Sequence, residues 1–219
     1  MIFLIRGGKT ESYGGFKARV LEEVLNLKTL AQIKSLSFVI SSEKRPIISI
    51  IPFSKKKIAS VSVYFKEPVD LPSLSQMEGF VGSYLVTEAL PVAYQKTWPL
   101  ESKTPGACLL TLFRSKNGIS YETFIDRWHH SHTPLSLKHH PLWHYSRNVV
   151  EDLLPEQAEP WQGIVEEHTK TRSELLNPFK FFGKPWVILQ RMLMVYKDTK
   201  SFIDYKSMET YLAEEYHVK

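Results

Sequence analysis

His132 is the residue best placed for chemistry in this sequence. From Tyr121 to Leu135 apolar residues recur at three- and four-residue spacing, and His132 follows Trp128 by four residues on the same face. An imidazole at the edge of an apolar surface can act as a general acid or general base near neutral pH. Cyclisation, dehydration and isomerisation depend on such a group. The alternative is a structural histidine that secures a helix end through one hydrogen bond.

A helix that begins after Ser120 must position this histidine. The Asn-Gly pair at 117–118 is a turn signal, and the Ser120 hydroxyl can accept from the free N–H groups of a first helical turn. Pro134 disfavours the helical conformation at Thr133, so we expect the helix to kink or end near His132. The imidazole would then lie where a helix meets a ligand site.

Three neighbours of His132 in the sequence are candidate ligand contacts. Trp128 lies one turn earlier and serves either as core or as cavity wall. Tyr145 and Asn148 lie on a predicted strand, 142–150, on opposite faces. The sequence does not show which of these two faces points inward.

The predicted last strand, 207–218, supplies two more candidates. Glu215 and His217 share one strand face with Tyr211 and Ala213. A carboxylate and an imidazole on an otherwise inward face indicate a site. The alternative is a solvent-facing pair near the end of the chain.

No metal site or cofactor is predicted. His139, His140 and His144 are close in sequence, but Pro141 prevents the last two from sharing a helix face. No cysteine is nearby and no carboxylate has ligand spacing, so we predict no metal. A haem stays open as an alternative, because one histidine and an apolar cavity supply an axial ligand.

Composition indicates an ordinary globular protein. The chain has 219 residues and a formal net charge of +5, which suits a small anion but does not require one. The single Cys108 allows no intrachain disulfide, so we expect a reducing compartment and a cytoplasmic location. No apolar run approaches the length of a membrane span. The lysines at 55–57 are isolated and no phosphate-binding glycine loop is present, so we expect no nucleic acid or nucleotide partner.

The two halves of the sequence resemble each other. Residues 108–114 resemble residues 2–6, and the likeness continues at an offset of 108 into a helix cap and an apolar helix face. At this offset Arg6 matches Arg114, Ser12 matches Ser120 and Phe16 matches Phe124. A second block matches at an offset of 127, Ser83-Tyr84-Leu85 with Thr210-Tyr211-Leu212. Such self-similarity predicts a tandem repeat.

Each half reads as strand, helix, strand, strand, helix, strand, which is the ferredoxin-like unit. We therefore predict an α+β protein with two ferredoxin-like halves, residues 1–100 and 107–219. Each unit leaves one sheet face uncovered, so the two faces are expected to close into an intrachain α/β barrel of the dimeric type. A small-molecule ligand in the barrel cavity and a homodimer are further expectations.

The motif around His132 resembles the signature of the EthD-domain family, which belongs to the dimeric α/β barrel superfamily. The matching residues are Gly118-Ile119-Ser120, Phe124, Trp128, His132 and Pro134-Leu135, with weaker likeness at Tyr145-x-Arg147-Asn148 and Glu215-Tyr216-His217-Val218. The likeness covers residues 107–219. The first half lacks the motif, because the offset places Val24 at the position of His132.

The resemblance implies a cofactor-independent enzyme that transfers protons during cyclisation, dehydration or isomerisation of an aromatic, polyketide or lactone-like substrate. His132 would be its acid or base. The resemblance is also compatible with a non-catalytic accessory or binding protein of an oxidative catabolic pathway, or with a haem-binding barrel. A fold of this kind fixes the architecture more firmly than the activity. With one motif in the chain, the first half would serve as a wall.

Overall fold

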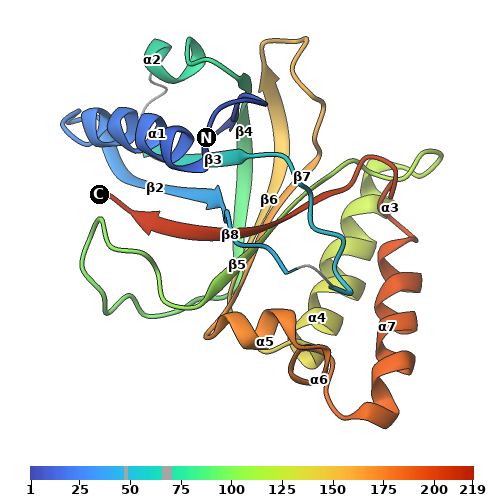
Figure 1. The fold of residues 1–219 in the computed structure, drawn as a ribbon. Coiled ribbons are helices and arrows are strands. Elements are labelled where there is room, and N and C mark those ends of the chain that lie inside the picture. The colour runs from blue at the N-terminus through green and yellow to red at the C-terminus, as the bar shows by residue number, and fades with distance from the viewer. Residues whose placement is uncertain (47–48, 66–70) are drawn as a thin grey trace.

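The protein is an eight-stranded antiparallel barrel with helices packed outside it (Figure 1). The computed structural model describes residues 1–46, 49–65 and 71–219. The elements of the first half are β1 (Ile2–Arg6), α1 (Tyr13–Leu27), β2 (Ile33–Ser41), β3 (Ile58–Phe65), α2 (Pro72–Ser75) and β4 (Phe80–Val92). Those of the second half are β5 (Ala107–Phe113), α3 (Tyr121–Asp126), η1 (Arg127–His132), α4 (Thr133–His139), β6 (Leu142–Leu154), β7 (Gly163–Thr169), α5 (Arg172–Leu176), α6 (Pro178–Phe181), α7 (Pro185–Thr199) and β8 (Glu209–His217).

The barrel closes through two junctions between the halves. Its strand order is β1-β3-β2-β8-β5-β7-β6-β4, and β4 pairs back onto β1. The junctions are β2 against β8 and β4 against β6. Within each half the order is the same, β4-β1-β3-β2 and β8-β5-β7-β6. The predicted α+β barrel is therefore confirmed, and the stretches 1–100 and 107–219 share one closed sheet.

Apolar packing occurs in separate layers inside and outside the barrel. The interior is filled by alternate strand residues such as Leu4, Tyr84 and Leu110. Outside the first half, α1 packs on the sheet through the four residues that the sequence pattern predicted, Phe16, Val20, Val24 and Leu27. Outside the second half, the helices pack on the opposite strand faces, and Figure 1 shows them on the far side of the barrel from α1.

Two segments differ from what the sequence pattern predicts. The stretch 186–197 is apolar nearly all round, which is typical of a buried helix; it is helical, in α7, but Trp186 is 74% exposed and Leu189 69%. Ile188, Met192 and Val195 take the core side and leave the other face outside. The pattern at 173–182 predicts one short helix, but the structure has two, α5 and α6, divided before Pro178.

The pattern at 47–53 is compatible with a strand or a loop. Residues 47–48 lie outside the described ranges, and residues 49–53 form a loop with one bridge, Phe53 to Thr210.

No helix in the described ranges is both long enough and apolar enough to cross a membrane.

A glycine on β7 allows the aromatic packing that holds the second-half helices. Gly163 pairs with Phe113 across the ladder, and a Cβ atom there would overlap the Phe113 ring. That ring contacts Trp128 edge-on, with centroids 4.9 Å apart, so its position sets the helix that carries His132.

We predict that Gly163→Ala lowers the free energy of unfolding by about 1–3 kcal/mol, as overpacking does. Gly14→Ala is the matched control, because Gly14 is a helical glycine with no atom within 4 Å of an added Cβ. Gly14→Ala should raise the free energy of unfolding by about 0.4–1 kcal/mol, because alanine lowers the conformational entropy of the unfolded chain. Urea denaturation measures both. Equal stability of wild type and Gly163→Ala would contradict the packing described.

Candidate functional site

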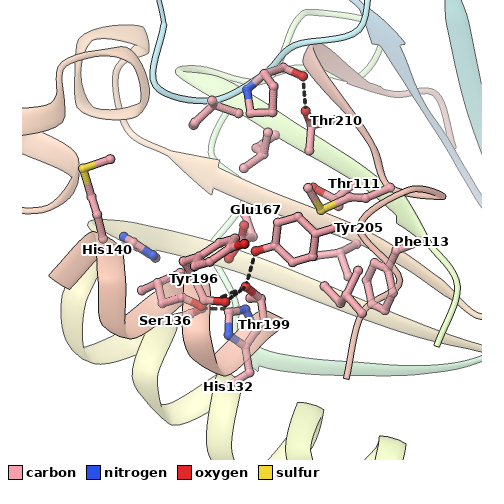
Figure 2. Close-up of a pocket in the computed structure, with 18 of the residues that line it drawn as sticks. Thr111, Phe113, His132, Ser136, His140, Glu167, Tyr196, Thr199, Tyr205 and Thr210 are labelled. Atoms are coloured by element: carbon pink, nitrogen blue, oxygen red, sulfur yellow. Dashed lines mark hydrogen bonds between the residues drawn. The ribbon is translucent and has the colours of Figure 1, made fainter. Parts of the chain in front are cut away.

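His132 lines a cavity of about 540 Å³ outside the barrel wall, between the second-half sheet and the helices. We call this cavity the outer pocket. Figure 2 shows His132, Ser136, Tyr196 and Thr199 close together among its lining residues, with Glu167 beside them. The first half contributes the loop residues 50–52 to its rim, held there by the bond from Thr210 Oγ1 to the Pro52 carbonyl. The expected role of the first half as a wall is thus seen in this one loop.

A wide helical turn aims His132 into the pocket. Residues 127–132 form the π-helix η1, in which the Thr133 N–H bonds to the carbonyl of Trp128, five residues back. Pro134 supplies no N–H, so the regular four-residue pattern is interrupted here. The chain does not end its helix at His132 but continues into α4, so the predicted break takes the form of this turn.

The π-helix keeps one row of side chains over the pocket. Trp128, His132, Ser136 and His140 all line it at four-residue intervals. In a regular α-helix, each residue is rotated about the helix axis by about 40° relative to the residue four positions earlier, so four residues at this spacing would not share one side. The wider π-helical turn reduces this rotation. Insertions of this kind occur frequently at functional sites.

His132 forms a hydrogen-bonded chain with two partners. Its Nδ1 lies 2.8 Å from Asp198 Oδ2, and its Nε2 lies 3.1 Å from Ser136 Oγ. Asp198 also accepts from the Ser131 hydroxyl. Burial alone would raise the pKa of Asp198, but the hydrogen bonds from His132 and Ser131 hold it below its usual range. An ionised Asp198 requires a hydrogen on Nδ1, which leaves Nε2 as an acceptor facing the pocket.

Glu167 brings a carboxyl group into the same pocket from β7. Burial raises the pKa of this carboxyl above its usual range, although the nearby His132 opposes the shift. In its protonated form this carboxyl can donate a hydrogen bond or a proton to a ligand oxygen. An imidazole and a carboxyl group therefore line one cavity, a combination that proton-transfer sites use.

Hydroxyl groups complete the polar part of the pocket. Thr199 Oγ1 and the Tyr205 hydroxyl are 2.5 Å apart. Figure 2 marks this hydrogen bond with a dashed line. The remaining wall is largely aromatic and aliphatic, and includes Phe113, Val165 and Phe202. Apolar walls with a few convergent polar groups are the usual form of a small-molecule site.

The structure brings together three of the six predicted site residues. Trp128 and Tyr145 line the outer pocket with His132, and both are buried. Asn148 lies on the opposite face of β6 and points into the barrel, where its Nδ2 donates to Ser146 Oγ and to the Ile164 carbonyl. The strand period of two separates Tyr145 from Asn148 across the barrel wall.

Glu215 and His217 also point into the barrel, at one end of it. Their side chains lie 3.3 Å apart, and the Tyr94 hydroxyl is 2.7 Å from each. The expectation of an inward-facing pair on the last strand agrees with this placement. These residues lie on the opposite side of the barrel wall from His132.

Sequence reasoning missed three members of the His132 site. Ser136 follows His132 by four residues, so the helical period could have found it. Glu167 alternates with Glu166 and His168 on its strand, and the choice of face was open. Asp198 is 66 residues from His132, and no local pattern in the sequence links the two.

Protein groups hold the two histidine rings of this wall in place. Both ring nitrogens of His132 are hydrogen-bonded, to Asp198 and to Ser136. The His140 ring is stacked on Phe181 at 4.1 Å between centroids, and its Nδ1 bonds to the Phe181 carbonyl.

Comparison with known proteins gives no match for this chain, either among protein-family models, among curated proteins or among solved structures.

We predict that Asp198→Asn lowers the free energy of unfolding at pH 7 by about 1–3 kcal/mol, the usual contribution of a hydrogen bond to a charged group. Because the folded pKa of Asp198 is lowered, its ionisation contributes stability above the unfolded value of about 3.8 and loses it as the pH falls through the folded pKa. The difference between wild type and variant should therefore shrink below about pH 4. Urea denaturation at pH 7 and pH 3 measures it.

The control is Asp126→Asn, because Asp126 pairs with His130 at the surface and its side chain is 72% exposed. Its effect should stay within about 0.5 kcal/mol at either pH. A loss from Asp198→Asn no larger than this would mean that the bond to His132 is not formed.

Proposed function

We propose that this protein is a small-molecule enzyme in which His132 removes and returns a proton without a cofactor. The observation that carries the proposal is the chain Asp198–His132–Ser136 opening on an apolar cavity that also holds the Glu167 carboxyl. The substrate class is an aromatic, polyketide or lactone-like compound with an acidic C–H beside a carbonyl group.

The geometry supports the following division of roles. His132 Nε2 accepts the proton from substrate carbon, while Asp198 keeps the opposite nitrogen protonated and stabilises the imidazolium that forms. Glu167 donates to the carbonyl oxygen as its charge grows, so that an enol results. The same two groups return protons to complete an isomerisation, a dehydration or a cyclisation. In the free protein the Ser136 hydroxyl occupies the Nε2 position that the substrate C–H would take.

The wall of the pocket suits an aromatic ligand. Trp128 and Phe202 line the pocket and are stacked on each other, with 14° between their planes, and Phe113 meets Trp128 edge-on. Ring contacts of this kind favour flat, apolar substrates and exclude water around the imidazole.

The ferredoxin-like interpretation of each half and membership of the EthD-domain family are also proposals. Two observations support them: the strand order recurs in the two halves, and the Trp128-x-x-x-His132 motif lines a pocket. A homodimer and a cytoplasmic location belong to the same proposal. The exposed apolar row on α7 supports the homodimer.

The Ser136 contact favours a second candidate, acyl transfer. A serine hydroxyl bonded to a histidine that is itself bonded to an aspartate is the arrangement of nucleophilic hydrolases. Ser136 would then attack a lactone carbonyl and lose its proton to His132. This candidate requires Ser136, whereas direct proton abstraction by His132 does not.

We predict that the protein catalyses exchange of acidic C–H hydrogens for deuterium in bound ketones and lactones. The assay incubates a panel of aryl ketones and benzofused lactones in D₂O and follows mass by mass spectrometry. His132→Gln should lower the rate by about 10²–10⁴-fold, the usual contribution of a general base. His130→Gln is the matched control, because His130 lies on the same helix, is exposed and pairs only with Asp126.

Ser136→Ala separates the two candidates. If Ser136→Ala still catalyses deuterium exchange, the result supports proton transfer. Acyl transfer is supported if this variant no longer opens lactones and if a fluorophosphonate forms a covalent adduct on Ser136 of the wild-type protein, detected by mass spectrometry. Binding of panel members without any turnover would contradict both and leave the accessory role. Equal rates in His132→Gln and His130→Gln would remove His132 from the chemistry.

A further inference from the structure

A second polar cluster lies inside the barrel at one end, on the opposite side of the sheet from His132. Strands β7 and β8 each carry a glutamate and a histidine two residues apart on their inward faces, Glu166 with His168 and Glu215 with His217. Strand β5 separates β7 from β8 in the barrel. Two Glu-x-His pairs therefore face the same space from non-adjacent strands. The proposed proton transfer uses none of them.

Three of these side chains have the geometry of a ligand set. One ligand atom each from Glu166, His168 and Glu215 lies within 4.8 Å of the other two. His168 Nδ1 is 3.8 Å from Glu215 Oε2. Bonds from zinc to imidazole nitrogen or carboxylate oxygen are about 2.0–2.2 Å long, so a central cation requires each atom to move inward by less than about 1 Å.

Several polar atoms of the cluster have no partner among residues 1–46, 49–65 and 71–219. Glu166 is 7% exposed and His168 1%, yet within these ranges Glu166 Oε1 and His168 Nε2 accept or donate no hydrogen bond. The buried Nδ1 of the neighbouring His144 also lacks a partner there. A buried polar atom without a partner costs about 1–3 kcal/mol, so three in one place indicate a missing ligand.

The charges of the cluster indicate the sign of that ligand. Glu166 and Glu215 are both buried, and Glu88 lies on the same inward side of β4, where it accepts from Ser146 and Tyr64. In the described part of the chain, no lysine or arginine forms an ion pair with Glu166 or Glu88. A cation would offset the burial of these carboxylates beside one another.

Two histidine rings face the same space. The rings of His144 and His168 lie 5.1 Å apart between centroids. A neutral imidazole offers a lone pair to a cation. His217 has a different role, since its Nε2 and the Tyr94 hydroxyl both contact Glu215 and orient that carboxylate. Such outer hydrogen bonds accompany most metal ligands in proteins.

A second cavity borders the cluster. It has a volume of about 460 Å³, is lined by Glu166, Glu215, His144 and His217, and is also lined by the exposed Lys34. The Tyr94 ring lines it as well and lies 4.1 Å from His144 between centroids. The cavity is therefore the side from which an ion would reach these groups.

We propose that this end of the barrel binds one divalent transition-metal cation of the zinc, manganese or iron(II) class, through Glu166, His168 and Glu215, with His144 as a fourth ligand. Two carboxylates neutralise the charge of the ion, and the mixture of imidazole and carboxylate is the set that these metals share. The ion links β6, β7 and β8 inside the barrel. This assignment replaces the sequence-based expectation of no metal, which rested on spacing along the chain.

The test is metal content and metal-dependent stability of the full chain. Protein treated with a chelator is dialysed against Zn²⁺, Mn²⁺ or Co²⁺, and the bound metal is measured by plasma mass spectrometry. We expect close to one equivalent for at least one ion and a higher melting temperature with it. We also expect visible Co²⁺ bands of a nitrogen- and oxygen-ligated ion. Less than one tenth of an equivalent for all three ions, with no change in melting temperature, would overturn the proposal.

Two neighbouring variants make the test specific. Glu166→Gln should abolish metal binding, yet the metal-free variant should be at least as stable as metal-free wild type, because the amide avoids a buried carboxyl. Glu167→Gln is the matched control, since Glu167 is the adjacent residue on the opposite strand face, and it should bind metal as wild type does. Equal metal binding by Glu166→Gln and Glu167→Gln would place the ion elsewhere and contradict the assignment.

Discussion

Closure of the sheet is the constraint on which the other features depend. A strand directs alternate side chains to its two faces, and in a closed barrel one face meets the interior and the other meets the helices. On β7 the residues 166–168 illustrate the result: Glu166 and His168 point inward, while Glu167 between them lines the outer pocket. A single strand thus supplies groups to two separate sites. A register slip of one residue would exchange them.

The outer pocket further depends on how one helix is held against this wall. Trp128 is buried between Phe113 and Phe124, and the wide turn that follows it directs His132 and Ser136 to the same cavity. The bond between His132 and Asp198 then joins this helix to α7. The interaction closes the pocket on the far side and at the same time fixes which imidazole nitrogen carries hydrogen. One hydrogen bond therefore fixes both the position and the tautomer of the proposed base.

Local patterns were sufficient to predict the barrel, the buried face of α1 and the role of His132 as the residue facing a pocket. Periods of 3.6 and 2 are written in consecutive residues, so each element and its faces could be inferred. Contacts between residues that are far apart in the sequence could not be inferred in this way. Asp198 meets His132 only because α7 returns across the sheet, and Glu166 meets Glu215 only because the barrel curves. The exposed face of α7 could not be predicted, because the helix is apolar on both faces. Which of its faces is buried depends on the elements that pack against it.

The measurement that tests the central claim most directly is the tautomer of His132 in the free protein. Long-range ¹⁵N–¹H NMR of the ring, assigned with His132→Gln, distinguishes the two forms at pH 8. The account predicts hydrogen on Nδ1, donated to Asp198, with Nε2 as the acceptor, and ring resonances that move when an aromatic ketone or lactone is added. Hydrogen on Nε2, or a ring that no ligand perturbs, would contradict the assignment of His132 as the base.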